Sequence, residues 1–219
     1  MEPQQLRTGR PPVTSGEYAY HELRTQILTG RIAAGERIVQ SELADQLGVS
    51  VTPVREAMRR LQSEGLVQLL PHRGATVRRL EFKEAQEIYQ LRAQLEPLAI
   101  ERSLDGLTST HIAELELLCA NMDDTNNVSE FAELNQRFHD LLLALDDSSW
   151  LARIVQMLRM ASSPYVALSL HANPTLMTTS NNEHRQMVHA LAQHDIPRLT
   201  QIVTDHLEAT VTTLANHLD

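Results

Sequence analysis

Residues 49–66 read VSVTPVREAMRRLQSEGL, and this stretch predicts a short amphipathic helix with clear signals at both ends. Thr52 can serve as the N-cap and Pro53 can take the first helical position, where its missing N–H costs nothing. Gly65 marks the end of the helix. The expected inner face is apolar and consists of Val54, Ala57, Met58 and Leu61. The remaining surface carries three arginines, Arg55, Arg59 and Arg60.

The flanking segments predict that this helix belongs to a winged helix-turn-helix. A first helix is expected in YAYHELRTQIL, with ordered structure beginning near Glu17. The stretch SELADQLG predicts a second helix that is capped by Ser41 and ends at Gly48, one tight turn before the arginine-bearing helix. Downstream, LVQLL and ATVRR read as two strands around a PHRG hairpin. The tip of this wing would hold His72, Arg73 and Gly74.

Charge divides the chain into a basic and an acidic part. Residues 1–79 hold 11 Lys and Arg against 8 Asp and Glu, whereas residues 80–219 hold 8 against 20. The net charges are therefore +3 and -12, which together give the -9 of the whole chain. This asymmetry predicts that the first part binds a polyanion and that the second does not.

The acidic part is expected to be an antiparallel helical bundle. Six segments between residues 82 and 219 have apolar residues at three-four spacing, and nothing in them indicates a strand. Pro97 and Pro164 fall inside two of these segments, where kinks or breaks are expected. Four apolar side chains are expected in the core, namely Trp150, Met157, Met160 and Met187. The fold class is thus mainly α, with domains at residues 17–79 and 80–219.

Residues 1–16 are polar, contain a Pro-Pro pair and are expected to form a flexible tail. The chain has no apolar run long enough to span a bilayer and no signal-peptide core, so a cytoplasmic protein without membrane contact is expected. The single cysteine, Cys119, excludes an intrachain disulfide framework and is expected to be a small buried hydrophobe.

Four polar residues of the acidic part are placed by their spacing to meet. Asn135 and His139 lie four residues apart, on one helical face. His184 and His206 lie on the last two helices, each about eleven residues from the turn near Asp195, so they should lie at similar heights. Three imidazoles and an amide oxygen from facing helices would form a divalent metal site with room for an exogenous ligand.

The stretches AAGERIVQSELADQLGVS, VTPVREAMRRLQSEGLV and PHRGATV resemble the DNA-binding domain of the GntR family of bacterial transcription regulators. The resemblance covers roughly residues 17–79 and implies a homodimer on a palindromic DNA operator, with the recognition helix in the major groove. Val51 stands where the family commonly has Arg, which predicts a different operator sequence. For Arg60, a contact with DNA and a position on the solvent-exposed face of the helix are both possible interpretations of the sequence. The candidate DNA-binding residues are Ser50, Thr52, Pro53, Arg55, Arg59, Arg73 and Gly74.

Residues 82–217 resemble the FCD-type ligand-sensing domain of the FadR-like branch of that family, through Asn135, Phe138–His139, Glu183–His184 and His206. The resemblance implies a metal ion, often zinc, nickel or manganese, that helps to bind a small carboxylate effector. Neutral Asn135 in place of Asp should weaken binding of a hard cation such as Mn²⁺, which favours zinc or nickel. A polar pocket without metal is the alternative.

Arg92 is a candidate clamp for the effector carboxylate, although Glu96, four residues later, offers it a structural ion pair instead.

Two classes of function fit these features. The first is a ligand-responsive, non-enzymatic transcription regulator that binds DNA. The second is a metal-dependent hydrolase with an appended DNA-binding domain. The hydrolase lacks an evident general base, because Glu183 adjoins His184 but points about 100° away around the helix.

Overall fold

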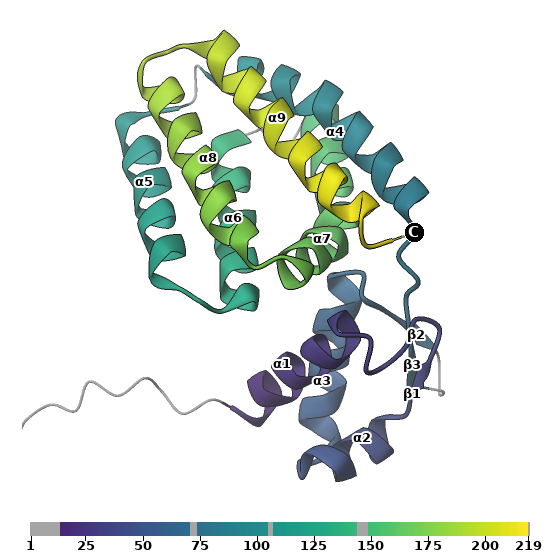
Figure 1. Ribbon diagram of the computed structural model, residues 1–219. Coiled ribbons are helices and arrows are strands. Elements are labelled where there is room, and N and C mark those ends of the chain that lie inside the picture. The colour runs from purple at the N-terminus through teal and green to yellow at the C-terminus, as the bar shows by residue number, and fades with distance from the viewer. Residues whose placement is uncertain (1–13, 71–73, 105–106, 144–148, 219) are drawn as a thin grey trace, which may run out of the picture.

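The computed structural model describes residues 14–70, 74–104, 107–143 and 149–218 (Figure 1). Two separate hydrophobic clusters divide these residues into an N-terminal and a C-terminal unit. The predicted fold class is confirmed: a winged helix-turn-helix precedes an all-helical bundle. Within the described ranges, no helix is both long enough and apolar enough to cross a membrane.

The N-terminal unit contains three helices and a small antiparallel sheet. Helices α1 (Ser15–Leu28), α2 (Gln40–Leu47) and α3 (Val51–Ser63) enclose a core to which α3 contributes all four of its predicted apolar residues. Strands β2 (Val67–Leu70) and β3 (Gly74–Val77) form the predicted hairpin. A two-residue strand β1 (Arg37–Ile38) was not predicted; it pairs with β3 and gives the order β1-β3-β2.

Each of the three helices of this unit starts two residues earlier than the sequence predicts. Helix α1 begins at Ser15 because Thr14 and Glu17 form a capping box, so residues 14–16 of the expected tail are ordered. Residues 1–13 lie outside the described ranges. Val39 precedes α2, so Ser41 lies inside that helix and does not cap it. Ser50 takes the N-cap position of α3, which places Pro53 third in the helix, where an N–H would still lack an intrahelical acceptor.

Over its described residues, the C-terminal unit is a bundle of six helices, as predicted. Its helices pack around one large apolar core that includes Cys119, whose pKa burial raises to about 11. Both Pro97 and Pro164 lie inside unbroken helices, so the expected breaks at these positions do not occur. The six helices are α4 (Phe82–Ser103), α5 (Ser109–Asp124), α6 (Val128–Leu143), α7 (Trp150–Ala172), α8 (Thr175–Ala192) and α9 (Ile196–Ala215).

Helix α7 presents apolar side chains to solvent, which corrects three of the expected core positions. Trp150 is 73% exposed, and Met157 and Met160 are also exposed, whereas Met187 on α8 is fully buried. The exposed residues follow helical spacing along one side of α7, and the guanidinium of Arg153 stacks on the Trp150 ring. Apolar periodicity thus identified the helix but did not identify which apolar side is buried.

Candidate functional site

Three helices bring the predicted histidines together inside the bundle. His139 comes from α6, His184 from α8 and His206 from α9, and their ring centroids lie 5.1 to 5.2 Å apart. A tight turn at His194 and Asp195 joins α8 to α9, so the two helices run antiparallel and the expected equal height of His184 and His206 is observed. One nitrogen from each ring lies within 4.8 Å of the other two.

The three rings fit a metal ion by their burial and by their unpartnered nitrogens. The residues His139, His184 and His206 are at most 8% exposed. Among the described residues, Nδ1 of His139 and both ring nitrogens of His184 have no hydrogen-bond partner. Buried polar atoms without partners are destabilising, and a shared cation would satisfy them. Nitrogens bound to one tetrahedral Zn²⁺ lie about 3.4 Å apart, so only a small inward movement is needed.

Burial also keeps these imidazoles in the form that binds metal. Desolvation lowers the pKa of His139 and of His184 well below the usual histidine value, and the nearby Arg159 lowers both further. Both rings are therefore neutral at pH 7 and have a lone pair available for a cation.

Glu183 was expected from helical spacing to point away from the histidines, but the structure places it in the site. Its side chain contacts the last histidine, with Oε2 lying 2.6 Å from Nδ1 of His206. A carboxylate on one ring nitrogen fixes the ring orientation and leaves the other nitrogen to bind a cation, which is the usual arrangement around protein-bound zinc.

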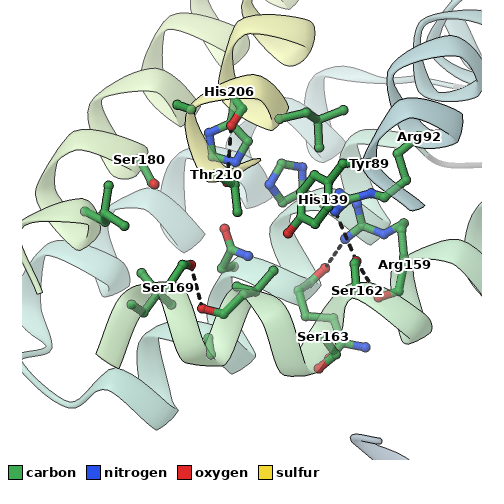
Figure 2. A pocket seen from close by; sticks show the side chains of 18 of the residues that line it. Tyr89, Arg92, His139, Arg159, Ser162, Ser163, Ser169, Ser180, His206 and Thr210 are labelled. Atoms are coloured by element: carbon green, nitrogen blue, oxygen red, sulfur yellow. Dashed lines mark hydrogen bonds between the residues drawn. The ribbon is translucent and has the colours of Figure 1, made fainter. Parts of the chain in front are cut away.

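A cavity of about 290 Å³ lies beside the histidines (Figure 2). Asn135, His139 and His206 line it, so the predicted oxygen ligand and two of the three imidazoles share one space. The volume is near the lower end of the range of about 300–1,000 Å³ typical of small-ligand sites. Figure 2 shows hydroxyl side chains around the same space, among them Ser162, Ser163, Ser169, Ser180 and Thr210.

Two buried arginines form the cationic side of the cavity. Nε of Arg92 lies 2.7 Å from Oε1 of Glu96, which is the structural pairing expected from the sequence, and its Nη1 donates to Ser162 Oγ at 3.0 Å. Arg159 on α7 also lines the cavity and was not predicted; it pairs with Asp140 at 3.2 Å and with Glu96 at 3.7 Å. Burial opposes ionisation of Glu96, but the two arginines offset this and lower its pKa.

Three of the candidate DNA-binding residues lie on the exposed side of α3. Thr52, Arg55 and Arg59 are all exposed, and within the described ranges neither arginine forms a hydrogen bond or an ion pair. Val51, in the first turn, is 43% exposed. Ser50 makes no side-chain capping bond, so its hydroxyl group is also available. These side chains together can contact phosphates and base edges.

Gly74 has a structural role that differs from the one expected of a wing tip. Its φ is +87°, and a Cβ atom there would lie 2.2 Å from the carbonyl oxygen of Ile38 on β1. Glycine is therefore needed for pairing of β1 with β3. Arg73 and the rest of the hairpin tip, residues 71–73, lie outside the described ranges.

Family models match both units of the chain. The model of bacterial regulatory proteins of the gntR family matches residues 16–77, and the model of the FCD domain matches residues 87–209. The chain belongs to the GntR family. The GntR match ends at the last residue of β3, and the FCD match begins within α4.

Several GntR-type proteins are similar to this chain. YdhC of Bacillus subtilis, an HTH-type transcriptional regulator, is 33% identical over 144 residues, a match that spans 63% of this chain and only 63% of YdhC. The HTH-type transcriptional regulator McbR of Escherichia coli is 26% identical over 179 residues, or 80% of this chain and 81% of McbR. The solved structure of E. coli McbR has the same fold, with a TM-score of 0.67 at 22% identity over 94% of this chain and all of that chain.

The two missed residues of the FCD domain leave only weak signals in the sequence. Arg159 is a lone cation in the largely apolar run IVQMLRMASS, three residues before the first of two serines, which is consistent with a polar wall inside a bundle. Glu183 precedes a candidate ligand histidine, but its contact with His206 depends on how α8 and α9 are rotated against each other. Helical spacing within one segment does not determine that rotation.

Proposed function

We propose that this GntR-family protein is a ligand-responsive, sequence-specific DNA-binding regulator of transcription. The observation that carries the proposal is a buried three-histidine cluster beside a cavity that two arginines line, in a chain that also exposes Arg55 and Arg59 on α3. The cavity supports small-molecule sensing, and the exposed arginines support DNA binding. Two copies joined through their FCD domains would place two recognition helices on a palindromic operator.

The proposed metal site consists of His139, His184 and His206, with Asn135 as an oxygen donor. Three neutral nitrogen ligands and a neutral amide favour Zn²⁺ or Ni²⁺ over Mn²⁺, which prefers carboxylate oxygens. When bound, the ion supplies a Lewis-acid position for an oxygen atom of the effector. Glu183 holds the ring of His206 in place.

The proposed effector is a small carboxylate that contacts both the histidine cluster and the arginine side of the cavity. Arg92 already uses Nε and Nη1 for Glu96 and Ser162. The Nη1 atom of Arg159 is buried, lies 3.7 Å from Oε1 of Glu96 and has no hydrogen bond within the described residues, so Arg159 is the better partner for an effector oxygen. The cavity size favours a compact organic acid over a long acyl chain.

Metal content and operator binding test this function together. Purified protein incubated with Zn²⁺ and desalted should hold about one ion per chain, and the double variant His139→Ala, His184→Ala should hold none. His189→Ala removes an exposed histidine from the same helix as His184 and should leave the content unchanged. DNA selected from a random library should be palindromic. A wild-type protein that takes up neither Zn²⁺ nor Ni²⁺, or selects no sequence, would contradict the proposal.

A further inference from the structure

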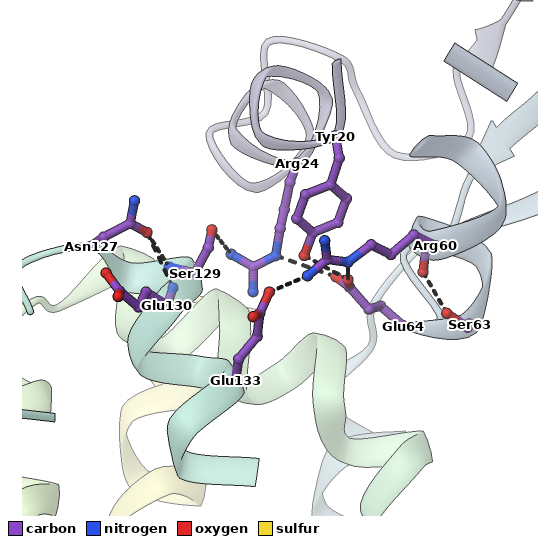
Figure 3. A network of polar contacts seen from close by, with 9 residues as sticks. All are labelled: Tyr20, Arg24, Arg60, Ser63, Glu64, Asn127, Ser129, Glu130 and Glu133. Carbon is purple, nitrogen blue, oxygen red and sulfur yellow. Dashed lines mark hydrogen bonds and ion pairs between the residues drawn. The ribbon is translucent and has the colours of Figure 1, made fainter. Parts of the chain in front are cut away.

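Arg60 lies on a different side of the recognition helix from the other arginines. It follows Arg59 directly, so its side chain is rotated by about 100° around α3, away from the side that carries Thr52, Arg55 and Arg59. There its Nη2 pairs with Oε1 of Glu133 on helix α6 of the FCD domain (Figure 3). Arg60 is therefore a contact between the two domains, a role not considered from the sequence.

A second arginine reaches the same helix. Arg24 on α1 is only 5% exposed and donates from Nη1 to the Ser129 hydroxyl group, 2.7 Å away in the first turn of α6. Its Nε lies 3.3 Å from Glu64, which also accepts a 2.6 Å hydrogen bond from Tyr20. Figure 3 shows these side chains as one network, in which the guanidinium of Arg60 stacks over the Tyr20 ring at 3.8 Å. Helices α1 and α3 thus contact α6 as a unit.

The other end of α6 belongs to the sensor cavity. Asn135 and His139 line the cavity, and His139 is part of the histidine cluster. Ten residues separate Ser129 from His139, a rise of about 15 Å along one continuous helix. Asn127 accepts hydrogen bonds from the N–H groups of Ser129 and Glu130 and so fixes the first turn. Helix α6 is the described element that both contributes to the histidine cluster and pairs with an arginine of the recognition helix.

We propose that α6 transmits occupation of the histidine cluster to the DNA-binding domain through the Arg24–Ser129 and Arg60–Glu133 contacts. This inference rests on the proposed metal site. Drawing His139 toward an ion displaces α6 along or around its axis, and both contacts at its other end must adjust. The orientation of α3 relative to the FCD domain then differs between the metal-free and metal-bound states, which gives two states with different operator affinity.

The two contacts between the domains differ in strength, and this difference decides which variant tests the proposal. Arg60 and Glu133 are 42% and 52% exposed, and ion pairs with this exposure are weak. Arg24 is buried, and its hydrogen bond to Ser129 is partly buried. Either change alone leaves one contact intact, so the test removes both with the double variant Ser129→Ala, Glu133→Gln. Glu114→Gln, at an exposed position on α5, is the matched charge control.

Hydrogen exchange measured by mass spectrometry, with and without Zn²⁺, tests the coupling directly. In the wild-type protein and in Glu114→Gln, Zn²⁺ should change deuterium uptake in peptides that cover α1 and α3. In the double variant this change should disappear, although the protein still takes up about one Zn²⁺ per chain. If Zn²⁺ binds but uptake changes only in α6, α8 and α9 of the wild type, or if the double variant responds like the wild type, the relay is wrong and the metal site stands. If Zn²⁺ does not bind to the wild-type protein, the proposed metal site and the proposed relay are both wrong.

Salt dependence separates an interdomain role of Arg60 from a phosphate contact. For Arg60→Gln, the slope of log affinity against log salt on the selected operator should equal that of the wild type. Arg59→Ala, one residue away, should reduce the slope by about 0.9, the value for one lost phosphate contact. An equal reduction in both variants would place Arg60 on the DNA and overturn this assignment.

Discussion

Glu183 and His206 form one hydrogen-bonded unit, with Oε2 of the carboxylate 2.6 Å from Nδ1 of the ring. Because this contact fixes the orientation of the ring, Glu183→Gln should weaken Zn²⁺ binding by about 10- to 100-fold. Competition with a chromophoric chelator measures the change. Glu208→Gln, at an exposed position on the same helix as His206, should bind Zn²⁺ like the wild type. Equal affinities in all three proteins would exclude a role of Glu183 in the site.

Asn135→Asp should strengthen metal binding and should do so most for Mn²⁺. The substitution keeps the shape of the side chain but adds a negative charge to a site of neutral ligands, and hard cations gain most from a carboxylate. Calorimetric titrations of both proteins give the ratio of variant to wild-type affinity for Mn²⁺ and for Zn²⁺. A Mn²⁺ affinity that does not change would show that residue 135 does not contact the ion.

Arg55→Ala should weaken operator binding by about 1–3 kcal/mol. Arg55 is exposed in the second turn of α3, where a guanidinium can bind guanine or a phosphate group. The measurement is a fluorescence anisotropy titration with the selected operator and with a scrambled duplex. Arg102→Ala removes an exposed cation of the FCD domain and serves as the control. Unchanged affinity in Arg55→Ala would contradict the assigned DNA-binding surface.

Gly74→Ala should destabilise the winged domain by at least about 1–3 kcal/mol, because a left-handed φ and a close contact with backbone act together. The added Cβ atom would lie 2.2 Å from the Ile38 carbonyl oxygen at a φ of +87°. Gly35→Ala provides a matched control, since Gly35 has a φ of +84° but no atom within 4 Å of such a Cβ. Differential scanning calorimetry of both variants should show the larger loss for Gly74→Ala. Equal losses would mean that the contact with Ile38 contributes nothing.

Sequence periodicity predicted the helices and the histidine cluster well, for a physical reason. His184 and His206 lie on helices joined by a tight turn, so counting residues from the turn determines their heights. In the same way, Asn135 and His139 share a face because they are four residues apart. Features that depend only on distance along one hairpin of helices can therefore be derived from residue spacing alone.

The features that were missed depend on packing between segments that are distant in sequence. Strand β1 has only two residues and exists because β3 pairs with it. The contact of Arg60 with Glu133 joins residues 73 positions apart. Trp150 was expected in the core because large apolar residues are usually buried, yet it lies on the solvent side of its helix. Composition and spacing show that these residues are present, but they do not show which distant segments the residues contact in the fold.

The contact between Gly65 and Pro164 limits how freely the two domains can be recombined. A Cβ atom on Gly65 would lie 3.6 Å from Cγ of Pro164 on α7 and 3.4 Å from Nη1 of Arg78, at a φ of +72°. Replacing the FCD domain with that of a relative therefore replaces Pro164, which lies against Gly65. It also replaces Ser129 and Glu133, the partners of Arg24 and Arg60. In a functional chimera, the residues on both sides of this contact between the domains must come from the same parent protein.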